Sequence, residues 1–101
     1  MFNAWMNHPM LHNMDYSSLG SGIMAGAVCP IETMIQVRER MNCKLISVYG
    51  LTESSPGMTV SRLTDSDEIR STTVGRPYPF VEVRVLDPET NEEVPDGTPG
   101  E

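Results

Sequence analysis

The segment Tyr49-Gly50-Leu51-Thr52-Glu53 combines residue types that suit a nucleotide-binding site. An aromatic ring can lie against a purine, and a glycine lets the backbone approach a ligand closely. A threonine hydroxyl can hydrogen bond to a phosphate oxygen, and a carboxylate can bind Mg²⁺. Taken alone, the same five residues also fit an ordinary turn at the end of a strand. The segments around them therefore decide the interpretation.

The segments before this stretch predict a strand, a helix and a second strand. Residues 19–27 are small and apolar and favour a buried strand that runs into a glycine-bearing loop. Pro30 suits the first position of a helix and Asn42 can close it, with apolar residues recurring between them at helical spacing. Residues 44–49 are apolar without alternation, as in a parallel strand covered on both faces. This order predicts a βαβ unit, and ligands of such folds bind where the parallel strands end, here at Tyr49.

The second half of the chain favours a different kind of structure. Residues 54–73 are rich in Ser and Thr and predict a long exposed connection rather than a helix or strand. Residues 81–85 alternate valine with charged side chains, which is the pattern of a half-buried antiparallel strand. Residues 87–92 predict a turn before a returning segment around Val94.

These segments predict an α/β fold in two parts. Residues 1–60 form part of an α/β subdomain with a partial parallel βαβ sheet, preceded by a short helix that Pro9 ends near Asn7. Residues 61–101 form the connection and the start of a β-rich, barrel-like subdomain.

Size and charge exclude several classes of protein. The 101 residues, of mass 11.2 kDa, allow one compact domain at most. Residues 51–101 carry the whole net charge of −7, which disfavours a nucleic-acid partner because acidic side chains repel phosphates. We expect no membrane span, since no apolar run is long enough. No targeting signal is recognisable, so we expect a cytoplasmic protein, with mitochondria as the alternative.

Other chemistry-bearing patterns do not form known sites. The glycines at 20, 22 and 26 miss the dinucleotide-binding spacing by one residue. His8 and His12 have the spacing of a zinc helix, but Pro9 breaks that helix. Cys29 and Cys43 fit neither a disulfide framework nor a zinc motif, so we expect reduced thiols. No nucleophile motif accompanies the histidines, which disfavours a triad hydrolase.

Three landmarks together resemble the adenylate-forming superfamily, which comprises AMP-forming acyl-CoA synthetases, luciferases and peptide-synthetase adenylation domains. Residues 22–30 look like that family's strand and adenine-side loop, and Tyr49–Glu53 match its Tyr-Gly-x-Thr-Glu motif. Residues 73–77, the segment from 81 to 90 and the terminal Pro-Gly-Glu resemble the stretch leading into its next core motif. The sequences of residues 24–30 and 49–56 are most similar to those of fatty acyl-CoA synthetases of the medium-chain or related types.

The resemblance implies roles for the residues that bind the substrates. Gly26 and Ala27 would lie along adenine through their backbone, and Tyr49 would pack on the adenine ring. Gly50 and Leu51 would border the acyl group.

The resemblance also implies that Thr52 and Glu53 are catalytic. Thr52 would hydrogen bond to the α-phosphate or the carboxylate oxygen, and Glu53 would ligate Mg²⁺. Such contacts act where charge grows at phosphorus during attack by the fatty-acid carboxylate. Val28 departs from the proline frequent in close relatives, which would loosen the adenine-side loop.

The resemblance therefore implies a ligase that uses ATP, Mg²⁺ and coenzyme A to convert a carboxylic or fatty acid to acyl-AMP and then acyl-CoA. The family's lysine-ended phosphate loop is missing, and Lys44 stands in no such motif. We therefore expect an internal fragment of the large N-terminal domain, which is inactive alone, poorly folded or associating, and completed by the remainder of the parent chain. The alternatives are an amino-acid adenylation or luciferase-type member, or a non-catalytic truncated nucleotide-binding module.

Overall fold

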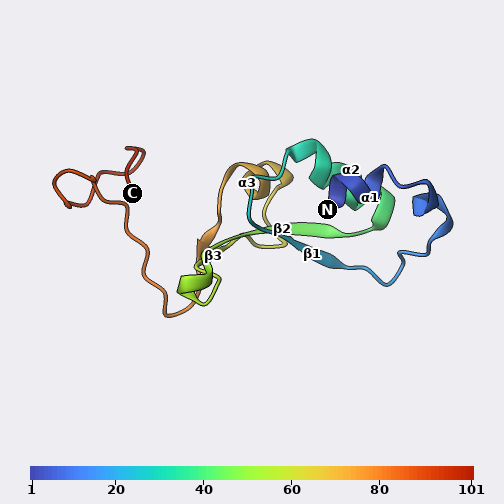
Figure 1. Ribbon diagram of the computed structural model, residues 1–101, viewed down its shortest axis with the longest axis horizontal. Helices are drawn as coiled ribbons and strands as arrows, with labels where there is room; N and C mark the ends of the chain where they lie inside the picture. The colour runs from blue at the N-terminus through green and yellow to red at the C-terminus, as the bar shows by residue number, and fades with distance from the viewer.

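A computed structural model describes all residues, 1–101, and places the helices on one face of a small sheet (Figure 1). Helix α1 spans Phe2–Met6 and is followed by a 3-10 helix over Pro9–Asn13. The predicted end of the first helix is confirmed, since Asn7 is its C-terminal cap. Proline suits the start of the 3-10 helix because a backbone N–H at that position would have no acceptor within the helix and the φ of proline is already helical.

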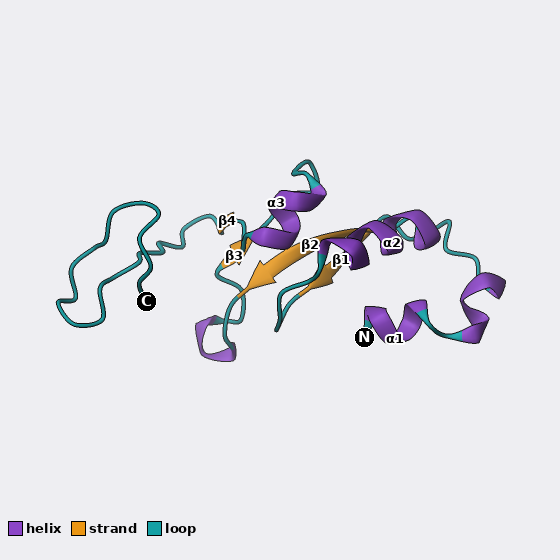
Figure 2. Ribbon diagram, turned by 90° about the horizontal axis from the view of Figure 1, so that it is seen from above, coloured by secondary structure: helices purple, strands orange, loops and turns teal.

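The predicted βαβ unit is confirmed. Strand β1 spans Ser21–Met24, helix α2 spans Ile31–Met41 and strand β2 spans Lys44–Tyr49. The two strands pair in parallel, and Figure 2 shows them side by side beneath α2. Asn42 closes α2 in the left-handed conformation, with φ of 50°, which asparagine tolerates better than most residues.

The sheet continues beyond the βαβ unit as a mixed sheet of four strands in the order β1-β2-β3-β4. Strand β3, Thr59–Val60, pairs antiparallel with β2, and β4, Arg76–Pro77, pairs antiparallel with β3. Helix α3, Asp67–Thr72, lies between them in sequence. The α/β class predicted from the sequence is therefore confirmed.

The prediction of an exposed connection over residues 54–73 is wrong. The segment contains β3 and α3, and several of its polar side chains are buried: Thr59, Ser61, Arg70 and Ser71. These side chains are tolerated inside because they hydrogen bond to backbone groups rather than to water. The sequence does contain a helix signal here, because Ser66 is a favourable N-cap residue and two acidic residues follow it in the first turn. In the structure the Ser66 hydroxyl accepts a hydrogen bond from the Ile69 N–H. The division into subdomains at residue 60 stays a prediction.

The hydrophobic core lies between the helices and one face of the sheet. It comprises Phe2, Met6, Leu11, Cys29, Met34, Val37, Met41, Cys43 and Leu45. Both cysteines are free, as expected, and burial raises the pKa of each thiol. The prediction that β2 is covered on both faces is wrong within this chain, since Ile46 and Val48 are only partly buried and Ile23 beside them is 60% exposed.

Residues 79–101 form an arm that projects away from the body of the molecule (Figure 1). The predicted strand over 81–85 is wrong, because no partner strand lies beside it and only one isolated bridge, Leu86 with Glu93, forms in the arm. The predicted turn over 87–92 is confirmed. The Asp87 carboxylate accepts hydrogen bonds from the Glu89 and Thr90 N–H groups, which lower its pKa.

Candidate functional site

The segment after β2 folds back onto the end of that strand. Tyr49 is the last residue of β2, and its carbonyl accepts a hydrogen bond from the Met58 N–H at 2.8 Å. Between them, Thr52–Ser54 form a short 3-10 helix. At Gly50 the returning chain is so close that a Cβ atom would overlap the carbonyl oxygen of Pro56. Only glycine therefore fits at this position without moving the backbone.

A cleft opens on the helix face of the sheet at the ends of β1 and β2. One side is the loop after β1, where Gly26 has a φ of +80°. The floor is the end of β2, and the far wall is residues 71–74, the end of α3 and the residues after it. This helix-side cleft has a volume of about 770 Å³, and its lining includes predicted site residues: Gly26, Ala27, Tyr49, Gly50 and Leu51.

A second cleft of about 630 Å³ adjoins the same end of β2. Ile23 and Ala25 line it, whereas Met24 lines the first cleft. Because side chains alternate along a strand, this second cleft lies on the opposite, open face of the sheet, and we call it the sheet-side cleft. Its lining is partly apolar, with Val48, Pro56 and Tyr78 joining the two β1 residues. Gly50 and Val48 line both clefts, so the two meet at the glycine of the motif.

The structure separates Thr52 and Glu53 from the helix-side cleft. Thr52 lines the sheet-side cleft and is exposed. Glu53 is also exposed, lines neither cleft and has no ion-pair partner. No three side chains of the metal-binding types gather anywhere in the chain. A single carboxylate nevertheless fits Mg²⁺, which is commonly held by one or two carboxylates together with the phosphates of its substrate.

The far wall of the helix-side cleft was missed by the sequence analysis. Ser71, Thr72 and Thr73 line it with hydroxyl groups. Each hydroxyl donates its hydrogen to a carbonyl of α3, Glu68 for the first two and Ile69 for the third, at 2.8–3.0 Å. Their oxygens can then act as acceptors for a donor group of a ligand. The capping signal at Ser66 could have revealed the helix that presents this wall.

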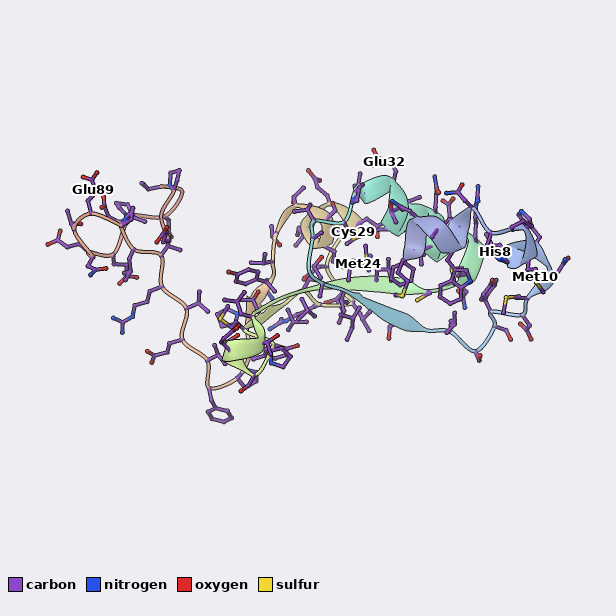
Figure 3. All side chains as sticks on the ribbon, viewed as in Figure 1. His8, Met10, Met24, Cys29, Glu32 and Glu89 are labelled. Atoms are coloured by element: carbon purple, nitrogen blue, oxygen red, sulfur yellow. The ribbon has the colours of Figure 1, made fainter.

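The histidines that the sequence analysis set aside line neither cleft, whereas Cys29 lines one of them. Figure 3 shows Met24 and Cys29 near the middle of the molecule and His8 and Met10 at the end that carries the 3-10 helix. His8 Nδ1 accepts a hydrogen bond from the Met10 N–H at 3.2 Å, so the ring caps that helix. Cys29 contributes to the lining of the helix-side cleft, although the residue is only 2% exposed. None of the helices is long and apolar enough to cross a membrane.

Comparison with known sequences gives matches along the entire chain. A family model described as "AMP-binding enzyme" matches residues 1–101. A Bacillus subtilis (strain 168) protein provisionally named acyl-CoA synthetase YngI is 46% identical over 102 aligned positions, covering 100% of this chain and 19% of the relative. The mitochondrial medium-chain acyl-CoA ligase ACSF2 of Danio rerio is 39% identical, covering 100% of this chain and 17% of the relative. The chain therefore spans about a fifth of the length of these relatives.

Solved structures share the fold. The amide bond synthetase McbA from Marinactinospora thermotolerans superposes with a TM-score of 0.78 at 31% identity, covering 96% of this chain and 19% of that one. The anthranilate CoA ligase AuaEII, solved in complex with anthranoyl-AMP, superposes with a TM-score of 0.82 at 24% identity, covering 96% of this chain and 18% of that one. The latter likeness shows the fold alone.

Proposed function

Because the chain belongs to the AMP-binding enzyme family, we propose that its parent protein activates a carboxylic acid with ATP and passes the acyl group to coenzyme A. Acyl-CoA ligases among the relatives support this reaction. The observation that carries the proposal is the meeting of two clefts at Gly50, within a motif suited to nucleotide binding. Adenylation needs this arrangement, since the acid must reach the α-phosphate of ATP from its own site.

The helix-side cleft takes the adenine. Tyr49 is 47% exposed in this chain, so its ring is available to pack on a purine, and the backbone of Gly26 and Ala27 borders the same space. Gly26 and Ala27 have no large side chain that would keep a flat ligand away from their backbone. The hydroxyl oxygens of Thr72 and Thr73 on the far wall can accept from the exocyclic amino group of adenine.

The sheet-side cleft takes the acyl group. Its apolar lining suits a hydrocarbon chain, which gains free energy on leaving water. Gly50 stands where this cleft meets the helix-side cleft and therefore borders the acyl group. Leu51, the next residue, lines the helix-side cleft and is 56% exposed. Its side chain borders the acyl group at the same junction.

The chemistry takes place at this junction. A carboxylate oxygen of the acid attacks the α-phosphorus of ATP, the bond to the bridging oxygen breaks, and pyrophosphate leaves with that electron pair. The Thr52 hydroxyl donates to an α-phosphate or carboxylate oxygen, and Glu53 holds Mg²⁺. When bound, Mg²⁺ neutralises charge on the phosphate oxygens. The thiol of coenzyme A then loses its proton and its sulfur attacks the acyl carbon; the bond from that carbon to the phosphate oxygen breaks, and AMP leaves with the electron pair.

The experiment is acid-dependent ATP–pyrophosphate exchange by the full-length protein. We expect Glu53→Ala to lower the rate strongly and to raise the Mg²⁺ concentration needed for half-maximal exchange. Glu89→Ala removes another exposed carboxylate, at the tip of the arm (Figure 3), and serves as the matched control. Unchanged exchange in Glu53→Ala would rule out the metal role, and wild-type protein without exchange for any acid would rule out the proposed function.

Two alternatives differ in substrate. An amino-acid adenylation or luciferase-type member would be recognised by which acids drive the exchange. The likeness to an amide bond synthetase gives an amine a specific claim as the acyl acceptor in place of coenzyme A. Supplying the acyl-adenylate product with either acceptor distinguishes them. A non-catalytic module would show nucleotide binding without exchange. The isolated chain should give no exchange, because it holds only part of the site.

The proposed location is the cytoplasm, with mitochondria as the alternative. Fractionation of cells that express the full-length protein distinguishes the two.

A further inference from the structure

Helix α3 carries a buried guanidinium group that the proposed chemistry does not use. Arg70 is only 3% exposed. Its Nη1 donates a hydrogen bond to the carbonyl oxygen of Leu45 in β2 at 2.7 Å, and its Nη2 pairs with the Asp67 carboxylate. Asp67 also pairs with Arg38 of α2. A buried charge is costly unless it is paired and hydrogen bonded, so this site is built around the guanidinium.

Arg70 and two serines complete an edge of β2 that lacks a neighbouring strand. Strand β3 pairs only with Val48 and Tyr49, so the earlier residues of β2 have no strand partner on that side. The Ser61 hydroxyl accepts from the Ser47 N–H at 2.8 Å, and the Ser47 hydroxyl donates to the Arg70 carbonyl. Side chains and the backbone of α3 thus replace a strand and fix α3 against β2.

The residues after Arg70 form the far wall of the helix-side cleft, residues 71–74. The other end of this wall is attached separately. The Thr59 hydroxyl donates to the Val74 carbonyl at 2.7 Å, and Gly75 lies so close to Val60 that a Cβ atom would overlap its carbonyl group. The far wall is therefore fixed at both ends, by the interactions of Arg70 at one end and by the hydrogen bond from Thr59 at the other.

We propose that Arg70 is a positioning residue that sets the distance between the far wall and Tyr49, and thereby the affinity for ATP. This inference rests on the proposed function in that the helix-side cleft takes the adenine. Lysine cannot replace arginine here, because an ammonium group lacks the planar fork that reaches Leu45 and Asp67 together. The acid, bound on the opposite face of the sheet, does not touch the wall and keeps its affinity.

The test measures KM for ATP and KM for the acid in exchange assays of the full-length protein. We expect Arg70→Lys to raise KM for ATP about tenfold, the effect of losing one hydrogen bond to a charged group, with KM for the acid unchanged within about twofold. Met41→Ala is the matched control, because it opens the core at the end of α2 remote from both clefts. An equal rise of both constants in Arg70→Lys, or the same ATP-specific rise in Met41→Ala, would reduce Arg70 to a structural role and overturn the proposal.

A second pair of variants tests the other attachment and does not depend on the folding of Arg70→Lys. Thr59→Val removes the hydrogen bond to Val74, whereas Thr59→Ser retains the hydroxyl. We expect the valine variant to raise KM for ATP selectively and the serine variant to match wild type. If Thr59→Val leaves KM for ATP unchanged, wall position does not set ATP affinity and the proposal is wrong.

A measurement without substrate separates this inference from the proposed function. Amide hydrogen exchange at residues 72–75 should accelerate in Arg70→Lys while the amides of α2 keep the protection seen in wild type. Absence of pyrophosphate exchange in the wild type would reject the proposed function, whereas unaltered amide exchange at the wall would reject the attachment through Arg70 whatever the enzyme activates.

Discussion

At the residue scale, Gly50 has the tightest backbone surroundings of the candidate site. The chain returns across it, and the space that a side chain would need is filled by Pro56. The sequence identified Gly50 together with Tyr49 and Glu53 because their types fit a nucleotide. It could not reveal Thr72 and Thr73, whose hydroxyls matter only because α3 places them opposite Tyr49. The roles of the motif residues in binding stay predictions.

Gly50→Ala should displace the loop that separates the two clefts. We expect kcat/KM of the full-length protein to fall about a hundredfold, the order found when reacting groups shift by about 1 Å. Gly20→Ala is the control, since a Cβ atom there meets nothing within 4 Å and φ is not positive. Activity within twofold of wild type in Gly50→Ala would mean that the loop shape is not needed for catalysis.

At the element scale, the βαβ unit was predicted and the elements after it were not, although the capping signal at Ser66 marked the start of α3. Helix α2 has its cap residues and apolar spacing within one local segment, so its sequence specifies it almost completely. The strand predicted over 81–85 has an alternating pattern but no partner in this chain, and a strand needs its partner to form. Residues 54–73 show the opposite error, because a hydroxyl-rich composition predicted an exposed connection where the structure has a helix. Hydrogen bonds hold that helix, α3, against β2.

Helix α2 should owe its position to the side chains on its buried face. Met34 is 1% exposed and sits between the helix and the sheet. Met34→Ala should lower the free energy of unfolding by about 2–5 kcal/mol, through lost burial and the cavity left behind. Gln36→Ala, on the exposed face, should change it by less than about 0.5 kcal/mol. Urea unfolding of the full-length protein measures both, and equal effects would contradict the packing described.

At the scale of the whole molecule, the chain is more extended than a compact domain of its length. Its radius of gyration is 16.3 Å, where a compact chain of this length has about 13 Å. Its accessible surface is 7554 Å², against roughly 5,700 Å² for a compact monomer of its mass. The surplus comes from the open face of the sheet and from the arm, where Phe80 is fully exposed. Composition alone, which is ordinary for a globular protein, could not predict this.

The isolated 101-residue chain should therefore associate or unfold without a sharp transition. Calorimetry and light scattering on the same sample test this. A cooperative heat-absorption peak from a strictly monomeric sample would show that the exposed apolar surface, including Ile23 and Val83, is tolerated without a partner. Limited proteolysis should cut first between residues 79 and 86, where the arm has neither helix nor strand.

The hydrogen bonds that Arg70 and Ser61 make with β2 also determine how a larger sheet can grow. Because these side chains occupy the backbone groups on one side of β2, no additional strand can insert there. Strand β1 has β2 on one side only and leaves its other side free. Any strand that extends the parallel part of the sheet must therefore pair with the free edge of β1, so this part of the sheet can grow from that edge alone.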